Sequence, residues 1–414
     1  MALHRGVGAG AGTVASEQGV KLRFLDGLRG LAALIVVIDH FAIGWFQAAT
    51  DGSIHLTHGA FESAAETTPL HLFVSGNFSV CVFFILSGIV LSAKFFRSGE
   101  KSFVIASAIK RYPRLMLPVL GCVLLAFFLM VTHVFYNAQA ASLTGSTWLG
   151  SFWQFNPNFF DALYQGVIGT FVKGSSDYNT VLWTMKTELI GSFLVFGLLL
   201  VAGKFRYRYL VYLVLGLLLI KTYYVAFVLG IALSDAYFRN GTASRARMHW
   251  GLWVPLVLAS VFLASCPVGT LDGTLFHYAQ GHMPLALSVT ITSHIFGAFG
   301  LIVAILYAPA LQYFLIKKPL LYLGKISFAL YLTHLYVIGS FSSYLFARIA
   351  PGVGYRIGFF LMLIPSAALI WLAAHYFDRF VDEPAIRLSS RIYRRFFQTN
   401  VERSAPITAK SRTA

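Results

Sequence analysis

The sequence predicts an all-α membrane protein, a polytopic bundle of about ten transmembrane helices with both termini in the cytoplasm. Hydrophobic residues make up 57% of the 414 residues and charged residues only 12%, whereas soluble domains carry about 25% charged residues. Many apolar runs exceed about 17 residues and lack the alternation that a membrane β-barrel requires. The net charge is +16, but the basic residues gather in short loops between apolar runs. That distribution predicts a topology signal and no nucleic-acid partner.

The expected helices follow from the apolar segments in order. They lie at residues 28–48, 77–96, 115–135, 181–203, 209–220, 222–238, 250–266, 287–309, 320–345 and 356–377. Segment 209–220 is short, and Lys221 alone separates it from the next segment. These two could also form one bent helix pair or a re-entrant hairpin.

Lys and Arg residues predict the orientation of the bundle. With the N-terminus inside, the basic clusters near residues 94–114, 204–208, 239–247, 317–318 and 379–412 all fall on the cytoplasmic side. The loops on the opposite side then hold only Lys173 and Arg348. An asymmetry of this size indicates that both termini are cytoplasmic.

The domain organisation is simple. We expect residues 1–22 to form a disordered cytoplasmic tail, residues 23–390 the membrane domain, and residues 391–414 a basic cytoplasmic tail. A plasma or inner membrane is the expected location. The long outer loop 136–180 is rich in Trp and Phe, which predicts an aromatic lid at the outer interface.

Neither cysteines nor histidines predict a metal site. The three cysteines lie in or beside apolar runs without CxxC spacing, so we expect buried small side chains and no disulfide framework. The outer loop 49–76 holds His55, His58 and His71 together with acidic residues. However, His55 and His58 are not on a predicted helix, and the flanking Gly, Ser and Thr residues indicate a solvated loop.

The first apolar segment carries two ionisable groups on one face. Every residue between Gly30 and Asp39 is Leu, Ala, Ile or Val. His40 follows Arg29 by eleven residues, which on a helix returns to within about 20° of the same face, about 16 Å farther along. Arg29 would lie at the cytoplasmic edge and His40 near mid-bilayer, where an ionisable group indicates a functional site. The alternatives are snorkelling of Arg29 to lipid phosphate and a structural hydrogen bond of His40.

A basic run, residues 110–114, precedes the third segment. It contains Arg111 and Arg114 and has two interpretations. One is a topological anchor, and the other is a phosphate clamp, because the forked guanidinium group suits phosphates. Arg29 at the same depth would extend such a clamp.

The fourth segment places Glu188 on one face with Thr184 and Ser192. We expect Glu188 in the outer half of its helix, facing protein or a water-filled cavity because an unpaired carboxylate in lipid is costly. Structural pairing with Lys186 or Lys221 is the alternative.

The ninth segment carries a small and polar stripe. Gly324, Ser327, Tyr331 and His334 recur at spacings of three and four residues. His334 would lie near mid-bilayer, level with His40. Proton handling, substrate binding and a structural hydrogen bond are all compatible with this pattern.

From about residue 23 to residue 390 the chain resembles the integral-membrane acyltransferase family 3, whose members O-acylate sugars, peptidoglycan and small metabolites. The matching motifs, in family order, are Arg23–Ala33 with His40, Val82–Gly88, Arg111–Leu115, Leu182–Glu188, Leu323–His334 and Asp382–Pro384. The Arg and His separated by ten residues are the most specific of these. Asp39 departs from the family, which usually has an apolar or aromatic residue before this histidine.

The resemblance implies an O-acyltransferase that moves an acyl group, in particular acetyl, from acyl-CoA to a hydroxyl of a carbohydrate or other small molecule. Acyl-CoA, in particular acetyl-CoA, would be a co-substrate reached from the cytoplasm, with no bound cofactor or metal. His40 would act as general base or carry the acyl group, and Glu188 would orient the acceptor or the histidine. The residues implied in donor or substrate binding are Arg29, Ser87, Arg111, Arg114, Tyr331 and His334.

His40 and Arg29 should open into one cavity shared with the basic residues of the inner surface. A proton-coupled transporter or exporter is the alternative function, because a helix bundle with a buried His and a buried Glu also describes such proteins. We find no pair of related halves of the kind that transporters often show.

Overall fold

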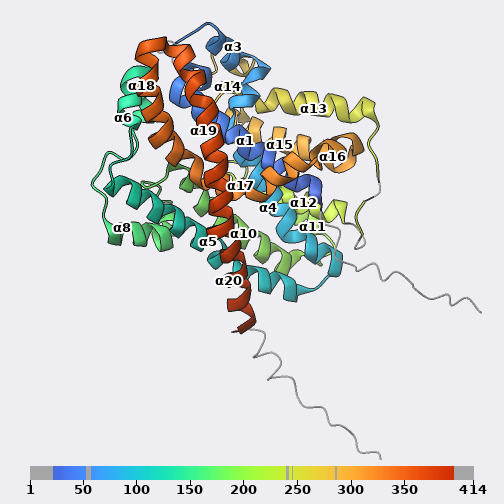
Figure 1. The fold of residues 1–414 in the computed structure, drawn as a ribbon. Helices are drawn as coiled ribbons and strands as arrows, with labels where there is room; N and C mark the ends of the chain where they lie inside the picture. Colours follow the sequence, from blue (N-terminus) through green and yellow to red (C-terminus); the bar gives the residue numbers. More distant parts are fainter. Residues whose placement is uncertain (1–21, 53–56, 239–241, 245, 285–286, 396–414) are drawn as a thin grey trace, which may run out of the picture.

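The computed structural model describes residues 22–52, 57–238, 242–244, 246–284 and 287–395, and within those ranges it is helical without strands. The helices pack into one bundle, from which helix α20 (Glu383–Tyr393) extends at one end, while α3 (Phe61–Thr67) lies at the opposite end (Figure 1). The predicted all-α membrane bundle is confirmed. Residues 1–21 of the predicted N-terminal tail and residues 396–414 of the predicted C-terminal tail lie outside the described residues.

Seven helices in the described part of the chain are long and apolar enough to cross a membrane. They are α1 (Arg23–Trp45), α4 (Gly76–Ser98), α5 (Lys101–Val131), α10 (Trp183–Ala202), α15 (Val289–Tyr307), α17 (Lys318–Val337) and α19 (Tyr355–Phe377).

The other three predicted segments form shorter helices, α11 (Arg208–Leu218), α12 (Tyr224–Tyr237) and α13 (Trp250–Ala264). The 11 residues of α11 reach about 16 Å, roughly half the hydrocarbon thickness. The remaining helical segments are α2 (Ala48–Asp51), η2 (Pro69–Val74), α6 (Asn137–Thr144), α7 (Thr147–Gly150), α8 (Phe159–Tyr164), η3 (Gln165–Gly169), α9 (Thr170–Val172), η4 (Thr180–Leu182), α14 (Phe276–Gln280), α16 (Pro309–Leu315), η7 (Ile338–Ser342), α18 (Ser343–Val353) and η8 (Asp378–Asp382).

Helix α5 begins earlier than the sequence predicted. It starts at Lys101, not at 115, and it contains both Pro113 and Pro118. Prolines are tolerated inside membrane helices where neighbouring groups satisfy the freed carbonyls, so Pro113 does not end the helix. The basic run therefore lies on α5 itself, which turns Arg111 and Arg114 toward other helices.

The predicted outer loop 136–180 contains several short helices. Its first part, α6 and α7, packs near the end of α1 and brings Trp148 against His40. Its second part, residues 159–172, packs along α5. There the hydroxyl of Tyr112 donates to the carbonyl oxygen of Val167 at 2.5 Å.

Helix α1 stands between two apolar clusters. One cluster joins it to α5, α17 and α19, and the other joins it to α4, α10, α12 and α15. The buried apolar residues of its first half, up to Ala32, belong to the second cluster, and those of its second half, from Ala33 to Trp45, belong to the first. The helix with the most specific motif is thus the centre of the fold.

Glycines allow α1 and α17 to touch backbone to backbone. A Cβ atom on Gly30 would lie 2.4 Å from the backbone nitrogen of Gly324, and one on Gly324 would lie 2.0 Å from the carbonyl oxygen of Asp26. His40 lies ten residues after Gly30, and His334 lies ten residues after Gly324. Because the helices run in parallel from this crossing, both histidines arrive at one depth, about 15 Å along the axis.

Candidate active site

His40 of α1 and His334 of α17 form a hydrogen-bonded pair, which confirms that they lie level. The Nδ1 atom of His40 is 2.8 Å from Nε2 of His334, and Nδ1 of His334 is 2.8 Å from the carbonyl oxygen of Leu330. A carbonyl oxygen accepts only, so Nδ1 of His334 carries its proton and the Nε2 atom of the neutral ring accepts from His40. His40 therefore donates through Nδ1, and its Nε2 atom keeps a lone pair.

The two histidines differ in access. The His334 side chain is fully buried, whereas His40 lines a cavity and stacks against Trp148 with ring centroids 5.2 Å apart. His334 contacts His40 but does not itself line the cavity. This placement favours orienting His40 over the direct substrate contact expected from the sequence.

The cavity at His40, here called the outer cavity, has a volume of about 530 Å³. It lies among α1, α4, α7, α12 and the start of α15. Its polar lining includes Asp39, Asn77 and Tyr223, and Trp148 and Trp183 supply aromatic faces. The space is within the range of small-molecule binding sites.

A second cavity of about 220 Å³, the inner cavity, lies toward the ends of the helices that carry the basic clusters. The residues predicted as site residues that line it are Arg29, Ser87, Arg111, Arg114, Glu188 and Tyr331. Lys325 lines it as well, so four cations converge from α1, α5 and α17. Such a concentration of positive charge suits an anionic ligand.

Glu188 belongs to the inner cavity. It forms an ion pair with Arg111 and accepts a hydrogen bond from the Ser87 hydroxyl at 2.6 Å. Arg111 also donates through Nε to Ser192 at 2.7 Å. The shared polar face of this helix is confirmed. The expected position of Glu188 in the outer half is wrong, since it lines the inner cavity, and so is the alternative pairing with Lys186 or Lys221. The partner comes from α5, a neighbour that sequence spacing does not reveal.

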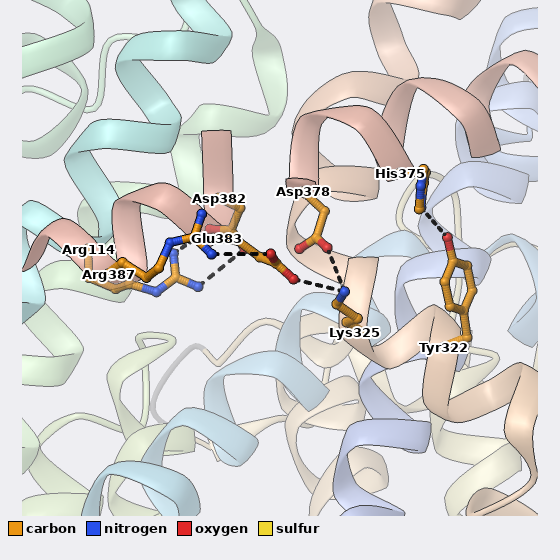
Figure 2. Close-up of polar contacts among 8 residues, drawn as sticks. All are labelled: Arg114, Tyr322, Lys325, His375, Asp378, Asp382, Glu383 and Arg387. Atoms are coloured by element: carbon orange, nitrogen blue, oxygen red, sulfur yellow. Dashed lines mark hydrogen bonds and ion pairs between the residues drawn. The ribbon is translucent and has the colours of Figure 1, made fainter. Parts of the chain in front are cut away.

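The cations at the mouth of the inner cavity are held by acidic residues of the C-terminal helices (Figure 2). Arg114 forms an ion pair with Asp382, and the Lys325 ammonium lies 2.9 Å from Glu383 and 3.5 Å from Asp378. A π-helical turn at Asp378–Asp382 joins α19 to α20 and directs these carboxylates to one side. The motif Asp382–Pro384 thus has a structural partner for each of its acids.

The two cavities meet but do not form the one cavity expected from the sequence. Val80 and Tyr331 line both. The Tyr331 hydroxyl lies 2.9 Å from the carbonyl oxygen of Val181 and 2.9 Å from the hydroxyl of Thr184, both on the segment that begins α10. Arg29 therefore faces the inner cavity and His40 the outer cavity, with Tyr331 at the boundary.

Sequence reasoning missed three residues of these cavities. Asn77 and Tyr223 were not singled out, although an amide in the first turn of a membrane helix is an intramembrane polar group and could have been. Lys325 lies inside a quoted motif, next to Gly324, and its charge in an apolar segment was the available signal.

Comparisons with known proteins identify the family of this chain. A family model described as acyltransferase domain matches residues 22–375. The O-acetyltransferase PaAT-1 from Phomopsis amygdali is 26% identical over 434 aligned positions, covering 91% of this chain and 85% of that protein. No solved structure matches the chain.

Proposed function

Because the chain belongs to the acyltransferase family whose domain model covers residues 22–375, and is thus a membrane O-acyltransferase, we propose that it moves an acetyl group from acetyl-CoA to a hydroxyl of a carbohydrate or another small molecule. Family membership favours this enzyme over the transporter considered from the sequence. The finer assignment of donor and acceptor rests on the two cavities and on His40, which lines the outer one.

The observation that carries the proposal is the hydrogen-bonded histidine pair, from which we infer a lone pair on Nε2 of His40. Its partner His334 fixes the ring with Nδ1 protonated, the arrangement in which a neutral imidazole serves as a general base. Nε2 takes the proton of the acceptor hydroxyl as that oxygen attacks the thioester carbon. The carbon–sulfur bond then breaks, and the leaving thiolate takes the proton from His40 to give free CoA.

His334 has a positioning role in this mechanism. It keeps the His40 ring in the productive tautomer, and its Nε2 atom stabilises the cation that His40 becomes after taking the proton. The alternative of an acyl-histidine intermediate uses the same Nε2 atom as nucleophile. Both routes place the reacting carbonyl on the outer-cavity side of Tyr331.

The inner cavity would hold the donor. Its volume of about 220 Å³ is below the range of about 300–1,000 Å³ for drug-sized ligands, so it suits the narrow pantetheine arm. The phosphates would then remain at the mouth, near Arg29, Arg114 and Lys325. Arg111 is already paired with Glu188 deeper inside, so we assign that pair to shaping the cavity wall.

The test uses purified protein, labelled acetyl-CoA and a panel of hydroxyl acceptors. We expect His40→Ala to abolish transfer while the protein stays folded in the membrane and still binds CoA. His282→Ala is the matched control, since His282 is exposed in an outer loop, and it should behave as wild type. Transfer by the His40→Ala protein at the wild-type rate would remove His40 from the chemistry.

A further inference from the structure

The wall of the outer cavity that includes Asp39 combines a carboxyl group with a fixed hydrogen-bond chain. We propose that Asp39, Asn77 and Tyr223 form an acceptor-binding wall that selects uncharged, hydroxyl-rich acceptors and rejects anionic ones. This inference rests on the proposed function, because it treats the outer cavity as the acceptor site. It goes further by assigning a specificity-determining residue and the charge class of the acceptor.

Asp39 is adjacent to the proposed base and is held in place. It precedes His40 on α1, and both line the outer cavity. Its carboxylate accepts a hydrogen bond from the backbone amide of Gly76, the first residue of α4. That contact fixes the orientation of the Asp39 carboxyl group in the cavity wall. A carboxyl group keeps further lone pairs in either protonation state, so this one contact leaves acceptor positions for a ligand.

Asn77 and Tyr223 are oriented by a buried histidine. His294 is fully buried, and its Nε2 atom lies 2.8 Å from the carbonyl oxygen of Cys266. Nε2 therefore carries the proton, and Nδ1 accepts from the amide nitrogen of Asn77 at 2.8 Å. The amide oxygen of Asn77 then accepts the Tyr223 hydroxyl at 2.7 Å.

This chain of hydrogen bonds decides which groups the wall presents to a ligand. The Tyr223 proton is already used, so its oxygen offers the cavity lone pairs. Asp39 likewise offers acceptor atoms. A ligand that fills this side must therefore bring hydrogen-bond donors, which hydroxyl groups supply and carboxylates or phosphates do not.

Charge strengthens the same selection. Among the described residues that line the outer cavity there is no Lys or Arg, while Asp39 and Asp51 both line it. An anionic acceptor would lose its hydration there without gaining a counter-charge. The inner cavity has the opposite character, since Arg29, Arg114 and Lys325 line it. An anion is thus expected on the donor side alone.

The aromatic residues add a flat apolar surface. Trp148 and Trp183 line the cavity beside this polar wall. A ring-shaped acceptor could place one face on these side chains and direct its hydroxyls toward Asp39 and Tyr223. One hydroxyl would then reach Nε2 of His40, because Asp39 and His40 both line this cavity.

The experiment compares two probes that differ in one group, p-nitrophenyl glucoside and p-nitrophenyl glucuronide, in which a carboxylate replaces the hydroxymethyl group. Binding of each to the purified full-length protein is measured by equilibrium dialysis, so the result does not depend on turnover. We expect the wild-type protein to prefer the glucoside by about a hundredfold. Asp39→Asn, which keeps an oxygen for the Gly76 amide, should reduce that preference at least tenfold.

Two further variants separate recognition from folding. Tyr223→Phe should weaken glucoside binding while keeping the preference for the uncharged probe. Asp272→Asn, at an exposed outer-loop carboxylate, should change neither. Equal binding of both probes, no binding of the glucoside, or an unchanged preference in Asp39→Asn would each overturn the proposal. Binding of CoA is measured in parallel, because its loss would refute the proposed function, whereas normal CoA binding with any of these results refutes this inference alone.

Discussion

Replacing Gly324 by alanine tests whether the contact between α1 and α17 sets the histidine pair. The new Cβ would stand 2.0 Å from the carbonyl oxygen of Asp26, whereas ordinary contact begins at 3.4 Å. The helices must therefore separate locally by about 1.4 Å, because a packed interior has no free volume to absorb the methyl group. Carried ten residues along, that shift would lengthen the 2.8 Å contact between His40 and His334 to about 4 Å, beyond hydrogen-bond range.

We expect Gly324→Ala to lower the acetyl-transfer rate per folded molecule about tenfold or more and to reduce stability by about 1–3 kcal/mol, a typical cost of overpacking. Transfer is measured with labelled acetyl-CoA at matched amounts of folded protein, and stability from thermal unfolding. Gly197→Ala on α10 is the control, since no atom lies within 4 Å of its added Cβ. Wild-type activity and stability in Gly324→Ala would refute the argument that this crossing holds the pair in register.

Other predictions concern the base, the donor and pH. His334→Ala should reduce kcat strongly with little change in the KM for acetyl-CoA, because His334 is the partner of His40 and does not line a cavity. An increase confined to the KM would contradict this prediction. Arg114→Gln should raise the KM for acetyl-CoA, because it removes a cation from the cavity mouth. Asp382→Asn should change this KM less, because it releases Arg114 from its ion pair. Wild-type kinetics in Arg114→Gln would restore the interpretation of Arg114 as a topological anchor. The buried His71 side chain precedes α4, and desolvation lowers its pKa from 6.5 to about 4. A lowered pKa gives stability that is present above pH 6.5 and lost as the pH falls toward 4, so acidification from pH 7.5 to 5 should cost about 2 kcal/mol from this group. His71→Phe should flatten the melting temperature over that interval relative to wild type, and parallel pH curves would exclude His71 as the cause.

Local periodicity accounts for what the sequence predicted well. The spacing of Arg29 and His40 on an uninterrupted apolar helix, and of Tyr331 and His334 on another, depends on helix geometry alone. The same holds for the face shared by Thr184, Glu188 and Ser192. Each of these groups lies at a cavity or against its wall.

Long-range pairing accounts for what the sequence could not predict. Arg114 and Asp382 are 268 residues apart, and no periodicity links them. The division into two cavities depends on where Tyr331 meets Val181, which is set by packing between α17 and α10. The predicted start of α5 was wrong because of Pro113, since proline interrupts helices in water more reliably than within a membrane bundle.

The close crossing of α1 and α17 restricts how this chain can vary. Deleting one residue between Gly30 and His40 would rotate the imidazole by about 100° and draw it back by about 1.5 Å. It would then point away from its partner even though every neighbouring helix stayed in place. That stretch can exchange one aliphatic side chain for another, but it tolerates neither an insertion nor a deletion, because a matching change in α17 would restore the depth of the pair and not the direction of its rings.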